Sequence, residues 1–278
     1  MLAATAGAAE ALRSALRRIA AATGHQLSAE FDSRPGRPVR LDLSDRAVHR
    51  GPLDLGRVDV VSGGAITNAT IYALLRVPEA SADLRVIEPE TIDLTNLNRY
   101  PLARHSDVDQ PKAKVLAGHA RGVIAISGIE ARFDDSWPVL LGSLAPRVLV
   151  GADQIPVRWA VQQAGPQWLQ VSGTSHFFAM GSSHHPDGPC AGCAHPTDEQ
   201  GDDPIPTIPF VSMWAGILQL LDLLEETAGQ PTAGHYTICY PFGLTGARPI
   251  IRGAIDKVSK CPVRCKASQS ATCGSRCN

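Results

Sequence analysis

Apolar and polar positions follow two patterns along the chain, and each pattern predicts one kind of secondary structure. Short β-branched runs bounded by turn residues predict buried strands at residues 57–64, 83–90, 122–132 and 146–153. Apolar positions with helical spacing predict helices between the first three strands, at residues 66–77 and 111–122. Strands that alternate with helices form a parallel sheet, so we predict an α/β fold with a mostly parallel sheet and helices on both faces.

Further elements are predicted on both sides of this alternation. Residues 1–24 predict a helix, and residues 25–56, which are rich in Pro and Gly, predict a loop-rich lead-in. Beyond the fourth strand, the pattern predicts two strands and one strongly apolar helix, at residues 168–173, 235–242 and 211–226. The tail at residues 261–278 is polar and Cys-rich, so it needs a metal or a host surface to become ordered.

Composition and charge narrow the class of protein. Hydrophobic residues make up 44% of 278, which is enough for a sizeable core. The net charge of -1 gives no electrostatic reason to expect nucleic acid or an anionic membrane as the main partner. No apolar stretch reaches the roughly 18 residues of a spanning helix, so we expect no membrane partner. The Ala-rich start, with Arg13, Arg17 and Arg18, favours an ordinary amphipathic helix over a transit peptide.

The cysteines are grouped late in the chain. None precedes Cys190, which forms a C-x₂-C pair with Cys193, and Cys261 forms a C-x₃-C pair with Cys265. Disulfide scaffolds are usually small and Cys-dense throughout, whereas clustered pairs in a large chain favour metal binding in a reducing cytosol. The spacing therefore predicts a metal site and a cytoplasmic location.

The turn after the first predicted strand, SGGAITN, partly matches the phosphate-binding fingerprint G-x-G-x-x-G. Ser62 and Thr67 stand at its outer positions, and Gly64 keeps the middle one, where the backbone must approach a phosphate most closely. Glu88 ends the next strand, near the spacing at which an acid binds ribose hydroxyls. These features alone support a dinucleotide-type fold and a plain tight turn equally.

The segment VIEPETIDLTNLNRYPL, residues 86–102, resembles the ThiF/MoeB family of ubiquitin-activating-like adenylyltransferases. In that family an acid-x-acid pair precedes an N-L-N-R-Q-like run, a P-K-A element follows, and a later strand ends in a D-N-like step with a nearby Arg. The chain supplies these features in the same order, with Glu88, Glu90, Asn96, Arg99, Tyr100, Lys112, Asp153 and Arg158. The resemblance covers residues from about 57 to about 265 and implies a Rossmann-like sheet.

The resemblance implies that the chain binds ATP and Mg²⁺. The residues implied in nucleotide binding are Gly64, Glu88, Glu90, Asn96, Arg99, Lys112 and Asp153. Glu88 would bind ribose with Glu90 in support, and Asp153 would hold Mg²⁺, because a hard cation needs oxygen ligands. Arg99, Lys112 and Asp153 are the catalytic candidates, since charge neutralisation dominates phosphoryl and nucleotidyl transfer.

The implied reaction is adenylation of a C-terminal carboxylate on a ubiquitin-like or sulfur-carrier protein, or on a peptide. Such a carboxylate has a pKa of about 3.3–3.7, so it is ionised at pH 7 and needs no general base. The resemblance also implies a homodimer in which an N-terminal Arg of one subunit reaches the other's ATP. Arg37, Arg40 and Arg50 are the candidates.

The resemblance further implies a structural zinc held by C-x-x-C in a crossover loop and C-P-x-C near the C-terminus. The expected ligands are Cys190, Cys193, Cys261 and Cys265. The second pair has one inserted residue, so Cys273 and Cys277 compete with Cys265 for the fourth position. The resulting organisation is a lead-in at 1–56, an ATP-binding domain at 57–260 and a zinc-clamped tail at 261–278.

Three alternatives compete with an adenylating enzyme. A non-catalytic member would keep the fold as a scaffold for nucleotide or peptide, since the outer glycines are replaced. A nicotinamide-dependent oxidoreductase gives no role to N-L-N-R, Lys112 or the cysteine pairs. Ser172, Ser175 and His176 lack the surroundings of a hydrolase nucleophile. Cys239 lies in an apolar strand pattern and is expected to be an inert buried thiol, so we predict no thioester-forming Cys.

Overall fold

A computed structural model of the chain describes residues 2–27, 51–134, 136–175, 177–198, 208–230, 234–241 and 250–264. Outside these ranges lie several residues singled out above: Arg37, Arg40, Arg50, His176, Cys265, Cys273 and Cys277. The helices are α1 (Leu2–Thr23), α3 (Ala65–Leu74), α4 (Lys112–Ala117), α5 (Trp137–Leu141), α6 (Ile155–Gln163), α7 (Ala191–Ala194) and α8 (Pro209–Thr227). The strands are β1 (Leu53–Val61), β2 (Ala80–Ile87), β3 (Ile124–Ile129), β4 (Arg147–Val150), β5 (Trp168–Ser175), β6 (Phe178–His184), β7 (His235–Cys239) and β8 (Ile250–Ala254).

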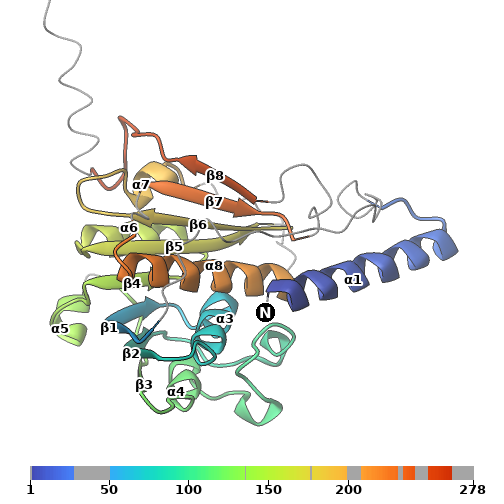
Figure 1. The fold of residues 1–278 in the computed structure, drawn as a ribbon, viewed down its shortest axis with the longest axis horizontal. Coiled ribbons are helices and arrows are strands. Elements are labelled where there is room, and N and C mark those ends of the chain that lie inside the picture. The colour runs from blue at the N-terminus through green and yellow to red at the C-terminus, as the bar shows by residue number, and fades with distance from the viewer. Residues whose placement is uncertain are drawn as a thin grey trace, which may run out of the picture.

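The described strands form one sheet in the order β3-β2-β1-β4-β5-β6-β7-β8 (Figure 1). Neighbouring strands from β3 to β5 are parallel, and those from β5 to β8 are antiparallel. The predicted Rossmann-like, mostly parallel sheet is therefore confirmed. The strand order reverses between β1 and β4, and open α/β sheets bind ligands beyond the carboxyl ends of strands at such a switch point.

Each face of the sheet buries its own core, as alternating side chains require. Val58 and Val60 of β1 belong to the core that packs against α3, α4 and α8. Val61 of β1 and Leu169 of β5 belong to the opposite core, which packs against α5, α6 and α7. The prediction of helices on both faces is confirmed.

Helices α3 and α8 cross in backbone contact. A Cβ atom added to Gly216 of α8 would lie 2.5 Å from the Cβ atom of Ala69 and 2.6 Å from the carbonyl oxygen of Ile66, both in α3. Only glycine fits there without displacing a helix. Thr70 of α3 also donates a 3.1 Å hydrogen bond to the Gly216 carbonyl. This contact fixes the position of α3, and with it the turn at which α3 begins.

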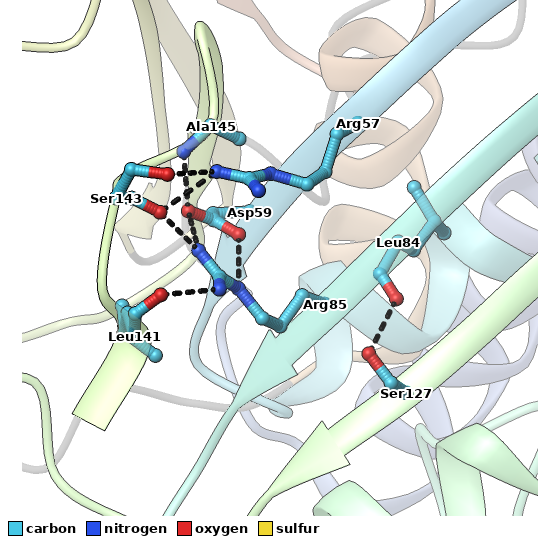
Figure 2. Close-up of polar contacts among 8 residues, drawn as sticks. All are labelled: Arg57, Asp59, Leu84, Arg85, Ser127, Leu141, Ser143 and Ala145. Carbon is cyan, nitrogen blue, oxygen red and sulfur yellow. Dashed lines mark hydrogen bonds and ion pairs between the residues drawn. The ribbon is translucent and has the colours of Figure 1, made fainter.

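A buried ion pair ties β1 and β2 to the loop before β4 (Figure 2). Asp59 is fully buried and accepts hydrogen bonds of 2.7 and 2.8 Å from Nε and Nη2 of Arg85, its neighbour across the two strands. Its second oxygen also accepts from the backbone N–H of Ala145 at 2.7 Å. Arg57 donates to the Ser143 carbonyl at 2.7 Å. Both oxygens of the Asp59 carboxylate thus accept hydrogen bonds, and the role of this residue is structural.

Some elements differ from the sequence prediction. Strand β1 starts at Leu53, because a register shift between Asp54 and Arg57 admits Gly56 with φ of 61° as a bulge within the strand. The described strands β6 and β8 and the helices α5, α6 and α7 were not predicted.

Helix α1 extends away from the sheet, as Figure 1 shows. Its first half packs through Ala9 and Leu12 against Trp214 and Leu218 of α8. The predicted N-terminal helix is confirmed. Among the described helices, none is long and apolar enough to cross a bilayer.

Candidate active site

The turn between β1 and α3 is held by its own side chains. Ser62 has φ of 92°, a left-handed conformation that costs a non-glycine residue about 1–3 kcal/mol. Its Oγ accepts from Gly64 N–H at 3.2 Å, and its carbonyl accepts from Thr67 Oγ1 at 2.6 Å. Asn68 Nδ2 donates to the carbonyls of Gly63 and Gly64, at 3.1 Å each. The turn therefore keeps a glycine-like backbone at its first position although that glycine is replaced.

Glu88, at the end of β2, joins this turn to the next connection. It is 5% exposed, and its two oxygens accept from Gly63 N–H at 2.5 Å and from Glu90 N–H at 2.9 Å. A Cβ atom on Gly63 would lie 2.9 Å from Glu88 Cγ and 3.2 Å from Lys112 Cβ. Gly63 therefore requires glycine, although it falls on a variable position of the G-x-G-x-x-G fingerprint.

Lys112 is the first residue of α4 and is only 6% exposed. Its Nζ atom lies 2.5 Å from Glu90 Oε2 and 5.8 Å from the ring centre of Tyr100. Burial acts to lower the pKa of Lys112, but the hydrogen bond that it donates to Glu90 and its electrostatic interactions with Tyr100 and Glu88 outweigh it, so the net pKa is raised. A charged ammonium group therefore lies beside the glycine turn.

The N-L-N-R run begins at the last residue of a short 3-10 helix, Leu94–Asn96, which has reciprocal capping. The side chain of Asp93 accepts from Thr95 N–H at 2.7 Å, and Asn96 Oδ1 accepts from Asp93 N–H at 3.0 Å. The hydrogen bonds from Thr95 lower the pKa of Asp93. Arg99 donates to the Thr95 carbonyl at 2.7 Å, and its Cζ lies 5.7 Å from the ring centre of Tyr100. The buried Asn96 amide thus shapes its own loop.

Asp153 follows β4 and is exposed. This end of β4 lies against the start of α3, since a Cβ atom on Gly151 would lie 3.2 Å from Thr67 Oγ1. Arg158 in α6 donates to His195 Nε2 at 3.1 Å. Burial lowers the pKa of Arg158 to about 10, and the charge of Asp153 acts in the opposite direction. Arg158 therefore links the Asp153 end of the sheet to the loop that carries the cysteines.

The predicted nucleotide-binding residues fall into two sets in the structure. One set surrounds the turn after β1 and comprises Gly64, Glu88, Glu90, Arg99 and Lys112. Outside it, the Asn96 side chain is engaged in its own loop, and Asp153 lies at the end of the neighbouring strand beside Arg158. Sequence reasoning assigned no role to Tyr100, which lies beside both cations of the first set. Its place directly after N-L-N-R was the available signal.

Three of the predicted metal ligands are brought together. The Sγ atom of Cys190 lies 3.8 Å from that of Cys193 and 3.3 Å from that of Cys261, and all three thiols are buried. Sulfur ligands at about 2.3 Å from a tetrahedral zinc lie about 3.8 Å apart, so the donor set suits this ion. A Cβ atom on Gly192 would lie 2.7 Å from Val263 Cγ2, which shows how closely the two Cys segments pack. The buried cluster can hold a metal, as the zinc-clamped fold requires.

Two other candidate nucleophiles are sequestered. Cys239 is fully buried, and burial raises its pKa to about 12, which confirms the prediction of an inert thiol. Ser172 is also fully buried, and its hydroxyl donates to Gln170 Oε1 at 3.1 Å. Neither of these two side chains is therefore accessible to a substrate.

The chain is similar to known proteins both in sequence and in fold. A model of the ThiF family matches residues 80–240. An uncharacterized protein of Sinorhizobium fredii, y4jF, is 32% identical over 177 residues, which cover 59% of the chain and 31% of the relative. The SAMP-activating enzyme E1 of Haloferax volcanii is 29% identical over 157 residues, which cover 53% of the chain and 56% of the enzyme. The matched part of the chain thus spans only 31% of the first relative and 56% of the second.

Solved structures with the same fold include E. coli MccB bound to ATP, with a TM-score of 0.60 and 17% identity over 74% of the chain and 66% of MccB. MccB in complex with N-formylated MccA has a TM-score of 0.61 and 16% identity over 74% and 67%. PaaA has a TM-score of 0.52 and 15% identity over 73% and 65%. At these identities the likeness establishes the fold.

Proposed function

The chain belongs to the ThiF family, and from this premise we propose that it binds ATP with Mg²⁺ and adenylates the C-terminal carboxylate of a peptide, ubiquitin-like protein or sulfur-carrier protein. Pyrophosphate is the second product. The names of two relatives support the substrate class: one enzyme activates SAMP proteins, and MccB binds ATP and the peptide MccA.

The proposal depends on one observation: the ammonium group of Lys112 is buried, and its ion-pair partner can be replaced by another anion. Lys112 is buried beside the Gly63 turn, whereas the side chain of Glu90, its ion-pair partner, is 67% exposed. Because the Glu90 side chain is largely exposed, its carboxylate can be solvated by water once another anion takes its place beside Lys112. A polyphosphate carries more negative charge than one carboxylate, so it can displace Glu90 from Lys112 without a large loss.

In the proposed reaction, a carboxylate oxygen of the substrate attacks the α-phosphorus of ATP. A new P–O bond forms, the bond between the α-phosphorus and the bridging oxygen breaks, and pyrophosphate leaves with the electron pair. No proton moves, because the carboxylate is already ionised at neutral pH. Arg99 and Lys112 neutralise the charge that gathers on the phosphates. The barrier is therefore one of charge and alignment.

Two acidic residues complete the proposed site. Each oxygen of Glu88 already accepts one backbone N–H, but a carboxylate has about four lone-pair positions, so it can still accept from a ribose hydroxyl. Asp153 offers an exposed oxygen ligand for Mg²⁺, which when bound neutralises phosphate charge.

We also propose that zinc occupies the cluster formed by Cys190, Cys193 and Cys261, with Cys265 as fourth ligand. A closed set of thiolates supplies folding energy and no open position for catalysis. In this chain it would hold the segment after β8 against α7, which Arg158 connects to the sheet edge through His195.

The decisive experiment pairs titration with MgATP and ATP–pyrophosphate exchange. Exchange is measured with short peptides ending in Gly-Gly, as the free acid or the amide; only the acid should support it. Lys112→Ala should slow exchange by about 10²–10³-fold, the cost of one preorganised donor. Lys114→Ala, an exposed lysine in the same helix, is the matched control. Equal exchange rates for wild type and Lys112→Ala would overturn the assignment.

A second candidate function has one observation in its favour. The N–H groups of Gly63 and Gly64 are already accepted by Glu88 and Ser62, so the turn is satisfied without nucleotide. A non-catalytic scaffold would use the fold in this state. Folded wild-type protein that supports no ATP–pyrophosphate exchange would select it, whether or not it binds MgATP.

A further inference from the structure

Tyr100 occupies a position in the candidate site that the nucleotide-binding set does not include. It follows the N-L-N-R run, where the related pattern has Gln, and it is 5% exposed. Its ring centre lies 5.7 Å from Cζ of Arg99 and 5.8 Å from Nζ of Lys112. Both distances fall within the range of about 6 Å over which an aromatic face attracts a cation. One buried ring therefore contacts both cations proposed to bind phosphate.

The hydroxyl end of Tyr100 faces the glycine turn. Its oxygen lies 3.9 Å from the place a Cβ atom on Gly64 would take. Burial raises the pKa of Tyr100, although Lys112 and Arg99 act to lower it, so the ring stays neutral at physiological pH. The side chain therefore spans the distance from the cations to the turn without adding negative charge where phosphates would bind.

Arg99 and Lys112 need a neighbouring group that keeps their side chains close together. Both side chains are long and flexible, and their like charges repel each other, so nothing in their own chemistry keeps them together. Arg99 also donates to the Thr95 carbonyl and to Asn98 Oδ1, both within its own loop, and Lys112 donates to the largely exposed Glu90. The ring gives both cations a common neutral anchor before any ligand arrives.

We infer that Tyr100 is a positioning residue, whose ring holds Arg99 and Lys112 together over the turn at Gly64 in readiness for a polyphosphate. The position of the ring beside Arg99 and Lys112 follows from the distances given above. Only the identity of the polyphosphate rests on the proposed function. The ring is the part of the side chain that lies near both cations, and the hydroxyl additionally hydrogen-bonds with Lys112. Tyr100→Phe should therefore preserve the role, and Tyr100→Gln, which restores the residue of the related run, should remove it.

The first test needs no nucleotide. The chain has five lysines, so reductive methylation with ¹³C-formaldehyde gives few NMR signals, and Lys112→Arg identifies the one from Lys112. Methylation keeps the charge. The Lys112 signal should show an aromatic ring-current shift in wild type and Tyr100→Phe and should lose it in Tyr100→Gln. An unchanged Lys112 signal in folded Tyr100→Gln would overturn the inference.

The second test measures MgATP affinity by calorimetry. Tyr100→Gln should bind about tenfold more weakly, in line with the loss of a desolvated cation–π contact, and Tyr100→Phe less than threefold. Tyr72→Gln is the matched control, because the Tyr72 ring lies 3.5 Å from the Arg76 guanidinium outside the site. Equal affinity of Tyr100→Gln and wild type would overturn the inference. If wild type binds no MgATP, the proposed function fails, and the Lys112 signal alone decides the positioning role.

Discussion

Replacement of Glu88 by Gln tests how the strand end and the turn depend on one carboxylate. The two oxygens of Glu88 accept from Gly63 N–H at 2.5 Å and Glu90 N–H at 2.9 Å, and the residue is 5% exposed. A glutamine amide has one acceptor atom, so in either orientation its NH₂ group faces one of these donors. The variant loses one charge-assisted bond, worth about 1.5–3 kcal/mol, and leaves a buried N–H without an acceptor. We expect the free energy of unfolding to fall by about 2–4 kcal/mol.

Urea denaturation followed by circular dichroism measures this change, with the slope of the transition checked for constancy. Glu130→Gln is the matched control, because Glu130 is an exposed acid just after the neighbouring strand β3. It should stay within about 0.5 kcal/mol of wild type. Glu88→Gln should also weaken MgATP binding, since it disturbs the turn and the proposed ribose contact. An unfolding free energy equal to that of Glu130→Gln would refute the reasoning.

Three further outcomes are expected. Asp59→Asn should lower the unfolding free energy by about 3–5 kcal/mol in urea, because it breaks a buried pair, whereas exposed Asp54→Asn should change it little. Metal analysis should find about one zinc per chain in wild type and Cys239→Ser and none in Cys190→Ser. Burial lowers the pKa of His184 to about 4, so the unfolded chain, with a His pKa of about 6.5, binds a proton that the folded chain does not. The contribution of His184 to stability should be full above pH 6.5 and fall toward pH 4, by up to about 1.4 kcal/mol per pH unit, and His184→Gln should remove this contribution and leave that of His195, whose pKa is also lowered.

The centre of the parallel half could be predicted because β4, most of β5 and the last part of β1 are buried on both faces. Such strands consist of unbroken apolar runs, and short helices separate them in the sequence. Strand β6 could not be predicted this way, because it buries polar side chains. Ser182 and His184 are both buried and hydrogen-bond to each other at 3.0 Å. Their burial depends on partners that only the folded sheet supplies.

The candidate site was predictable where it follows from topology. Glu88 directly follows β2, and Lys112 begins α4 in the connection from β2 to β3. Both therefore lie on the side of the sheet where the parallel strands end. The inward turn of Asn96 depends on a local capping contact with Asp93, which the sequence spacing alone permits but does not require. The contact of Tyr100 with two cations arises only when the N-L-N-R loop and α4 pack together.

The glycine contact between α8 and α3 constrains how relatives of this chain can diverge. Gly216 leaves no space for a methyl group opposite Ala69, and α3 starts at the turn that the proposed nucleotide would occupy. Two backbones in contact cannot absorb a larger residue by a rotamer change. Homologous sequences should therefore keep glycine at position 216 whichever residue stands at position 69, because the backbone oxygen of Ile66 and the backbone nitrogen of Thr70 also exclude a Cβ atom there.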